Sequence, residues 1–468
     1  MEAVMRLLVI AAVALAAIAL AGIAWGKRHA RRLQRERHIR IDRYKLKRRY
    51  RAVEREVLGD PEVAGTMEAY AREHRVSVGE AERLARRYLL EIVPKFNLLA
   101  YYRIGAPVAK AIMHLLYRVV VELKPIREFS ERHRGAVSVY MINHRSNADY
   151  VLVAHMLFKF ISLSYAIGEW ARIWPLNHLF KWFGGYFVRR RYREPLYHAV
   201  LSKYVQTITM HGVTQGVFLE GGLSRDGAFQ KPKLGMLDYI VTAKRNVDFT
   251  APLFIIPTAV NYDRVLEDRV LTEELMGKEE RSTRSEKLRA TFDFLFRNLW
   301  RSIAGRFKRY GYAIVAFGTP ISVDAFIRDH PAVLAPSFEQ RKPDVQRLAA
   351  MVMNSIAASM PVTPVTLVAH LFAHHPKAMS DSEIAAGLDE LMRAWQGRVW
   401  MLREKRGSEV WLAARRVLEL RGLVKPVERW RDDLFDRGGI PTIEDAWEWT
   451  PEELLLRDYY ANALRTDR

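Results

Sequence analysis

The sequence predicts an α/β protein: a mixed sheet flanked by helices, with an N-terminal transmembrane helix and helical N- and C-terminal additions. Three observations lead to this fold class. Between about residues 135 and 323, apolar runs of strand length alternate with amphipathic stretches of helix length. A long apolar run lies near the N-terminus. Helical periodicity dominates both flanks of the alternating region.

The N-terminal run from Leu7 to Trp25 is apolar throughout and, as a helix, about 28 Å long, which matches the hydrocarbon core of a bilayer. The alternative is a cleaved signal peptide. However, only Arg6 precedes the run, and a basic segment follows it instead of a small-residue cleavage site. We therefore expect residues 1–26 to be a single transmembrane anchor. The positive-inside rule then places the rest of the chain on the cytoplasmic face of the membrane.

Residues 27–94 are expected to form a basic helical juxtamembrane region. Its basic residues are consistent with a solvated helix or with a helix lying on anionic lipid. On lipid, each basic residue near the surface contributes about 1 kcal/mol to membrane binding. We disfavour nucleic acid as the partner, because no basic motif with interleaved aromatics occurs. The periodicity predicts a helix from Glu80 to Val93, before Pro94. Another helix is expected over Val108 to Leu123, packed on the neighbouring domain or resting on the bilayer.

The α/β domain is expected over residues 95–334, and a helical region over residues 335–468. The predicted strands are Ala136–Ile142, Ser162–Ile167, Tyr186–Val188, Gly216–Leu219, Leu253–Asn261 and Tyr312–Phe317. In the C-terminal region, helices are expected at Val345–Met360 and Val365–His374, followed by a charged helical tail from about residue 380.

The composition limits the chemistry. The chain has 468 residues and no cysteine, which excludes disulfides, thiolate metal sites and a cysteine nucleophile. A formal net charge of +21 favours anionic partners: nucleic acid, acidic lipid headgroups or phosphorylated substrates. No G-x-G-x-x-G, Walker loop or G-x-S-x-G elbow occurs, and no His/Asp/Glu spacing typical of a metal site. We expect no cofactor and no metal.

The first candidate site block is Asn143-His144-Arg145-Ser146-Asn147-Ala148-Asp149, between a predicted strand and a predicted helix. A turn there can bring His144 and Asp149 together. The carboxylate then accepts from one ring nitrogen and leaves the other free as a base. The alternative is a turn histidine bonded to backbone, with Asp149 as the N-cap of the next helix.

Three further blocks carry candidate binding residues. In the block from Gly184 to Arg191, a short predicted strand ends in arginines. Arg189 and Arg190 can form bidentate contacts with a phosphate, although a basic surface loop is an equal alternative. In Phe218 to Gly235, glycines can let backbone N–H groups approach an anion. Its candidate residues are Glu220, Gly221, Gly222, Ser224, Arg225 and Lys233. The fourth block contains Pro257 within an apolar run, which indicates an edge strand or a bulge that shapes an apolar slot.

Together and in this order, the four blocks resemble the glycerol-phosphate acyltransferase family, with its H-x-x-x-x-D, G-x-F-I-R-R, E-G-x-R-S and proline-containing apolar motifs. The matching residues are His144, Asp149, Gly185, Phe187, Val188, Arg189, Arg190, Glu220, Gly221, Ser224 and Pro257. Tyr262 to Val265 and Pro361 to Val365 resemble the subgroup that acylates the first hydroxyl of glycerol 3-phosphate or dihydroxyacetone phosphate. Leu456 to Tyr460 extends the resemblance. Leu223 stands where the family usually has arginine, and Arg225 is the candidate replacement.

The resemblance implies a membrane-anchored enzyme that moves a fatty acyl group from acyl-CoA or acyl-ACP to the sn-1 hydroxyl of glycerol 3-phosphate. His144 would be the general base, Asp149 would hold its ring, the cations would bind the phosphate, and Pro257 would line the acyl path. Expected partners are membrane lipids, glycerol 3-phosphate and the acyl thioester donor. The alternatives are a lysophosphatidate sn-2 or other lysophospholipid acyltransferase, a non-catalytic basic membrane scaffold, and a metal-dependent phosphohydrolase.

Overall fold

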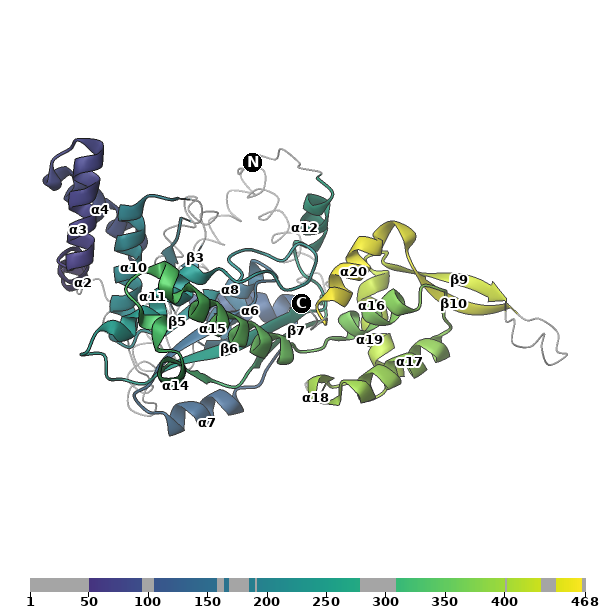
Figure 1. The fold of residues 1–468 in the computed structure, drawn as a ribbon. Coiled ribbons are helices and arrows are strands. Elements are labelled where there is room, and N and C mark those ends of the chain that lie inside the picture. Colours follow the sequence, from purple (N-terminus) through teal and green to yellow (C-terminus); the bar gives the residue numbers. More distant parts are fainter. Residues whose placement is uncertain are drawn as a thin grey trace, which may run out of the picture. The chain divides into compact units, whose positions relative to one another are not determined.

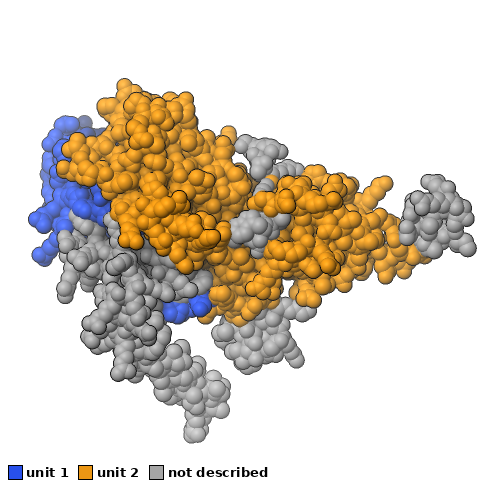
Figure 2. Space-filling view, turned by 90° about the horizontal axis from the view of Figure 1, so that it is seen from below, with its two compact units in different colours: residues 1–110, 153–215 blue, residues 111–152, 216–468 orange. Residues whose placement is uncertain are grey.

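The computed structural model describes residues 50–94, 105–157, 164–167, 185–189, 192–277, 309–399, 402–430 and 443–464. The chain divides into two compact units (Figure 2): residues 1–110 with 153–215, and residues 111–152 with 216–468. The expected anchor over residues 1–26, and most of the basic segment after it, lie outside the described residues. In the part that is described, no helix is both long and apolar enough to cross a membrane.

The first unit is built around helices from both ends of its sequence. Three come early, α2 (Tyr50–Leu58), α3 (Pro61–His74) and α4 (Val78–Ile92), and all contact the later helix α10 (Pro195–Met210). Capping side chains determine where two of these helices begin. Asp60 caps α3 with its carboxylate, and Ser77 and Glu80 form a reciprocal capping box at the start of α4. Two short parallel strands of this unit, β3 (Ser164–Ile167) and β4 (Gly185–Phe187), lie at two of the predicted strand positions.

The second unit contains a mixed sheet, of which Figure 1 labels β5, β6 and β7. The strand order is β1-β7-β6-β2-β5. These strands are β1 (Arg118–Val121), β2 (Val137–Ile142), β5 (Gln215–Phe218), β6 (Leu253–Tyr262) and β7 (Tyr312–Phe317). β6 pairs in parallel with β2 and antiparallel with β7, while β1 is parallel to β7. The predicted α/β class with a mixed sheet is therefore confirmed.

One predicted helix is partly a strand. Val108 to Leu123 was expected to be helical throughout, but α6 (Ala106–Leu116) ends after Leu116 and β1 follows. The valines of β1 pair with β7 from Tyr312 onward. Long-range pairing of a β-branched run overrides the local helical periodicity here.

Pro257 does not lie on an edge strand, because β6 is central. Met141 of β2 is its partner on one side. On the other side, β7 pairs with β6 up to Thr258, and the two-residue strand β8 (Ile321–Ser322) pairs with Phe254 and Ile255. Pro257 thus faces the gap between β7 and β8, where the ladder is interrupted and the missing N–H of proline is tolerated.

Helices surround this sheet. The shorter ones are α7 (Lys124–Arg132), α8 (Ala148–Leu157), α11 (Leu234–Thr242), α12 (Asp268–Leu275) and α14 (Val323–Asp329). The longest is α15 (Phe338–Ala358), which starts seven residues before the predicted Val345 because Ser337 and Gln340 form a capping box. Pro343 lies inside this helix, in its second turn, where it removes one i→i−4 hydrogen bond.

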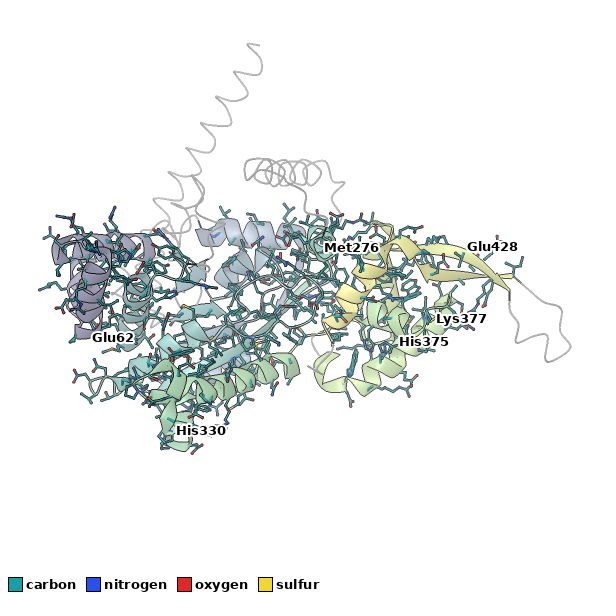
Figure 3. The ribbon with its side chains drawn as sticks, turned by 45° about the horizontal axis from the view of Figure 1, so that its top comes forward. Glu62, Met276, His330, His375, Lys377 and Glu428 are labelled. Carbon is teal, nitrogen blue, oxygen red and sulfur yellow. The ribbon has the colours of Figure 1, made fainter. Side chains whose placement is uncertain are left out.

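The C-terminal region was expected to be helical, and this is wrong in part. Its helices are α16 (Pro364–His374), α17 (Asp381–Ala394), α18 (Gln396–Val399), α19 (Gly407–Glu419) and α20 (Leu454–Asn462). Between the last two lies an antiparallel pair, β9 (Val424–Trp430) and β10 (Ile443–Trp449). His375 and Lys377 lie in the exposed turn after α16, and Glu428 lies on β9 (Figure 3).

Candidate active site

The loop between β2 and α8 is held at its first residue by the neighbouring strand. The Asn143 side chain donates to the Val260 carbonyl at 3.0 Å and accepts from the Val260 N–H at 2.7 Å. This amide pair continues the β2–β6 ladder beyond the end of β2. The residues that follow therefore leave the sheet in a fixed direction.

The predicted contact between His144 and Asp149 is present. His144 Nδ1 lies 3.0 Å from Asp149 Oδ2. The same oxygen accepts the backbone N–H groups of Arg145 at 2.8 Å and Ser146 at 3.0 Å, and Oδ1 accepts the Tyr262 hydroxyl at 2.6 Å. Asp149 is thus not the N-cap of α8, because its donors precede it in the loop. Just before the helix, the Ser146 Oγ accepts the Ala148 N–H at 3.0 Å.

The environment of the His144 ring selects the nitrogen that can act as a base. The ring stacks on Phe218, with centroids 4.2 Å apart, and Tyr150 approaches edge-on at 5.4 Å. Asp149 favours a proton on Nδ1, and within the described residues no hydrogen bond reaches Nε2. The residue is only 2% exposed. A substrate must therefore displace side chains to reach Nε2, which the sequence did not predict.

Glu220, a predicted substrate-binding residue, forms its hydrogen bonds with backbone groups. Its Oε1 accepts the His144 N–H at 2.9 Å and its Oε2 accepts the Gln230 N–H at 2.7 Å. Both oxygens thus bind backbone rather than a substrate hydroxyl or an arginine. Burial raises the pKa of Glu220 to about 7, although the two backbone donors oppose the shift. Glu220 therefore joins the backbone of the His144 loop to the loop after β5.

The glycine-rich loop also contacts the His144 loop. The Ser224 N–H donates to the His144 carbonyl at 3.0 Å, and the Ser224 hydroxyl donates to the Ala228 carbonyl at 2.7 Å. Gly221 has φ +68°, and a Cβ there would lie 2.8 Å from Lys233 Cγ. Gly222 is partly exposed, and so is available to an anion. Ser224 is thus used internally, not as a free donor to substrate.

Two of the predicted phosphate-binding cations are paired with carboxylates in this structure. Arg189, in the first unit, donates to both oxygens of Glu91 at 2.8 and 2.6 Å, and this hydrogen bonding raises its pKa. Arg225, in the second unit, is 60% exposed and lies 3.0 Å from Glu274. Lys233 is exposed, and Arg190 lies outside the described residues. Arg189 is therefore paired with Glu91 in this structure, and its contact with a phosphate stays a prediction.

Three residues of the site had no role in the sequence-based prediction. Tyr262 binds Asp149, Glu267 accepts the Ser146 hydroxyl at 2.7 Å, and Arg145 is 2% exposed with its Nη1 2.6 Å from the Gly227 carbonyl. Burial raises the pKa of Glu267. Tyr262 and Arg145 were inside recognised blocks, but their partners come from distant segments. No grouping of three or more His, Asp or Glu suited to a metal ion occurs in the described parts of the chain.

Two family models match separate parts of the chain. A model of the acyltransferase family matches residues 124–261, which hold the blocks around His144, Glu220 and Pro257. A model of the glycerol-3-phosphate acyltransferase C-terminal region matches residues 296–464. The chain is therefore similar to acyltransferases in its central part and to glycerol-3-phosphate acyltransferases in its C-terminal part. This confirms the resemblance inferred from the four blocks.

Curated relatives agree with this similarity. Proteins named glycerol-3-phosphate acyltransferase match from Aeromonas hydrophila (27% identical over 348 residues, 72% of this chain), Pseudomonas aeruginosa (28%, 71%) and Pseudoalteromonas translucida (26%, 72%). The chain spans only 40–41% of the length of these relatives. A solved 1-acyl-sn-glycerophosphate acyltransferase from Thermotoga maritima aligns over 54% of this chain and 81% of its own, with a TM-score of 0.30 and 19% identity.

Two segments that suggested the glycerol-3-phosphate acyltransferase subgroup contact each other. Asp263 accepts the Tyr312 N–H at 2.7 Å through Oδ2 and the Val365 N–H at 2.9 Å through Oδ1. The Asn261 side chain donates to the Pro361 carbonyl at 2.8 Å. Hydrogen bonds therefore connect the Tyr262–Val265 and Pro361–Val365 segments and hold the start of α16 against the end of β6.

Proposed function

We propose that this protein is a membrane-anchored O-acyltransferase that moves a fatty acyl group from acyl-CoA or acyl-ACP to the sn-1 hydroxyl of glycerol 3-phosphate, giving lysophosphatidate. The observation that carries the proposal is the His144–Asp149 pair at 3.0 Å, with no hydrogen bond to Nε2 from the described residues, in a chain similar to this family. A donor thioester and an acceptor alcohol need a base but no cofactor.

The chemistry follows from this pair. Nε2 of His144 takes the proton of the acceptor hydroxyl as its oxygen attacks the thioester carbonyl carbon, a contribution of about 10²–10⁴-fold. Asp149 holds the ring and stabilises the imidazolium. The new C–O ester bond forms, the C–S bond breaks, and the departing thiolate receives the proton from the imidazolium. No acyl-enzyme is needed, and Ser146 is occupied by Glu267.

Acceptor binding is assigned to the exposed cations of the glycine-rich loop. Arg225 and Lys233 are exposed, and Gly222 leaves backbone approachable beside them. The Arg225–Glu274 pair is solvent-accessible, so exchanging Glu274 for a phosphate costs little. Arg190 is the further candidate from the second block. Membrane attachment is assigned to residues 1–26, and contact with anionic lipid to the basic segment after them.

The acceptor assay tests the function. Purified full-length protein in detergent micelles is given labelled palmitoyl-CoA or palmitoyl-ACP with glycerol 3-phosphate, dihydroxyacetone phosphate or lysophosphatidate. We expect glycerol 3-phosphate to give labelled lysophosphatidate with the highest kcat/KM. Higher kcat/KM for lysophosphatidate would replace the proposal with sn-2 acylation. No transfer to any acceptor, with the protein folded, would favour the non-catalytic scaffold.

A further inference from the structure

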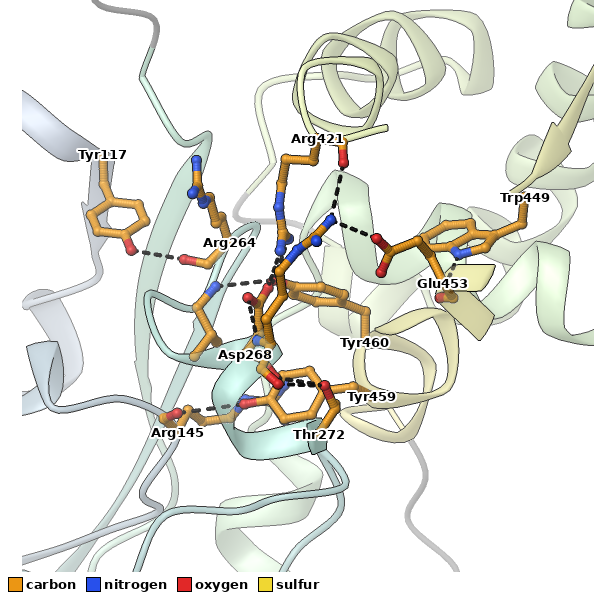
Figure 4. Close-up of polar contacts among 12 residues, drawn as sticks. Tyr117, Arg145, Arg264, Asp268, Thr272, Arg421, Trp449, Glu453, Tyr459 and Tyr460 are labelled. Atoms are coloured by element: carbon orange, nitrogen blue, oxygen red, sulfur yellow. Dashed lines mark hydrogen bonds and ion pairs between the residues drawn. The ribbon is translucent and has the colours of Figure 1, made fainter. Parts of the chain in front are cut away.

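The last helix, α20, contacts the loop that carries His144 (Figure 4). The guanidinium carbon of Arg145 lies 5.0 Å from the centroid of the Tyr459 ring. The Tyr459 hydroxyl also donates to the Arg145 carbonyl at 3.5 Å. Because Arg145 follows His144 directly, a residue near the end of the chain holds the backbone beside the candidate base.

The charge of Arg145 depends on this contact. Arg145 is 2% exposed, and only its Nη1 is hydrogen-bonded, to the Gly227 carbonyl at 2.6 Å. Among the described residues, Nε and Nη2 have no hydrogen-bond partner. A buried charge is costly unless it is compensated, and an aromatic face compensates a cation best where water is excluded. The Tyr459 ring, together with the Glu220 carboxylate that interacts with Arg145, therefore stabilises the Arg145 side chain.

The same helix contacts the glycine-rich loop. The Asn462 side chain donates to the Asp226 carbonyl at 2.9 Å. Gly227 has φ +78°, and a Cβ there would lie 1.8 Å from the Tyr459 carbonyl oxygen. Only glycine permits this close approach. The glycine-rich loop, whose Ser224 binds the His144 carbonyl, therefore packs against α20.

Tyr460 of α20 makes a second set of contacts, with residues close to Glu267. Its hydroxyl accepts from the Val265 N–H at 3.1 Å and from Arg421 at 3.0 Å, and it donates to Asp268. Arg421 also pairs with Asp268 at 2.7 Å, and both side chains are buried. Glu267, next to Asp268, accepts the Ser146 hydroxyl. The Tyr460 cluster (Arg421, Asp268 and Tyr460) therefore supports the other side of the His144 loop.

We propose that α20 is a working part of the acyltransferase centre. Tyr459 is a positioning residue that fixes Arg145 and, through it, the backbone of His144. Tyr460 fixes the turn that holds Ser146. The C-terminal region thus sets the catalytic geometry as well as adding stability. The kinetic test of this inference rests on the proposed function, but its structural test does not.

The test compares variants of the full-length protein in detergent. Tyr459→Leu keeps apolar bulk but removes the aromatic face, whereas Tyr459→Phe keeps that face. Leu455→Ala, at a 43% exposed position of α20, is the matched control. We expect Tyr459→Leu to lower kcat about 100-fold with little change in KM, the cost of misplacing a catalytic group by about 1 Å. Tyr459→Phe loses only the hydroxyl contact with the Arg145 carbonyl and should lower kcat much less than Tyr459→Leu, and Leu455→Ala should keep the wild-type kcat.

Hydrogen–deuterium exchange gives the readout that does not need turnover. Exchange in residues 143–149 and 224–228 should rise in Tyr459→Leu alone. In an Arg145→Met background, Tyr459→Leu should add little, because no charge remains for the ring to hold. Wild-type kcat and unchanged exchange in Tyr459→Leu, or effects that multiply in the double variant, would overturn the inference. An inactive wild-type protein would remove the proposed function, while the exchange data would still decide the role of Tyr459.

Discussion

The Asp149 carboxylate takes four hydrogen bonds, one each from the His144 ring, the Arg145 and Ser146 N–H groups and the Tyr262 hydroxyl. A carboxylate with this many donors is fixed in place and fixes the imidazole in turn. The spacing of His144 and Asp149 predicted the contact between them. It did not predict Tyr262, because that partner comes from the far end of β6.

The Asp149→Asn variant tests the role of this carboxylate. The amide loses an acceptor oxygen and favours the wrong tautomer of His144, so kcat should fall by about 10²–10⁴-fold. Tyr262→Phe removes only one donor to Asp149 and should lower kcat much less. Steady-state kinetics on both variants, with thermal unfolding as the folding control, makes the comparison. Asp149→Asn with wild-type kcat would refute the proposed function of the pair.

The buried Glu220 predicts a pH dependence of stability. Its pKa is about 7 in the folded protein and 4.5 for the unperturbed group, so between these values the folded state binds more protons. The stability that Glu220 contributes is full below pH 4.5 and is lost as pH rises toward 7. The total change is at most about 3 kcal/mol.

Thermal unfolding of wild type and Glu220→Gln measures this effect. The wild type should exceed the variant in Tm by more at pH 5 than at pH 7.5, because glutamine does not titrate. Asp263 and Glu267, whose pKa values burial also raises, are present in both proteins and cancel in the difference. A Tm difference that stays constant or grows with pH would show that Glu220 keeps a low pKa.

At the scale of elements, the glycine-rich loop after β5 connects acceptor binding to the His144 loop. Ser224 and Glu220 bind the His144 backbone from this loop, while Arg225 points to solvent and Glu274. In this loop, Glu220 and Ser224 therefore hold the backbone of the candidate base, whereas Arg225 is exposed and can bind a phosphate. This division could not be read from the motif, in which Glu220, Ser224 and Arg225 are nearly consecutive.

Arg225→Ala should therefore raise KM for glycerol 3-phosphate about tenfold or more, as the loss of a charge-assisted contact requires, while KM for the acyl donor stays near wild type. Glu274→Gln is the matched variant, because it frees Arg225 without removing it. Its KM for glycerol 3-phosphate should be equal to or below the wild-type value. Equal increases in both KM values for Arg225→Ala would indicate a disturbed loop instead of a lost phosphate contact.

The strand predictions are confirmed where the sequence has a local strand pattern. β7 occupies the predicted Tyr312–Phe317, and β6 extends the predicted Leu253–Asn261 by one residue. β1 was missed because its valines continue a helical pattern, and β8 because it has two residues. The β9–β10 pair was missed because highly charged strands such as Val424–Trp430 resemble a helical tail in composition. Pairing partners, rather than local preference, decide such segments.

At the scale of the whole molecule, the chain combines a proposed anchor with a C-terminal region that reaches the candidate site. The sequence predicted the α/β class and the motif residues, because both depend on local patterns. It assigned no role to the tail after residue 380, because the contacts of Tyr459 and Tyr460 involve residues up to 314 positions away. Such contacts leave no periodic signal in the sequence.

Membrane attachment is tested by deleting residues 1–26. The full-length protein should stay in the membrane fraction after washing with high salt, because a spanning helix is held by the apolar core. The deletion variant should bind anionic vesicles at low salt only, through the basic segment that begins at Lys27. Release of the full-length protein by salt alone would contradict a transmembrane anchor.

The central claim is that His144 takes the proton of the acceptor hydroxyl. The most direct measurement is the rate of labelled lysophosphatidate formation from glycerol 3-phosphate by wild type and His144→Ala at equal amounts of folded protein. His375→Ala, at an exposed turn after α16, is the control. The account predicts full activity in His375→Ala and a loss of about 10²-fold or more in His144→Ala. Comparable rates in wild type and His144→Ala would contradict it.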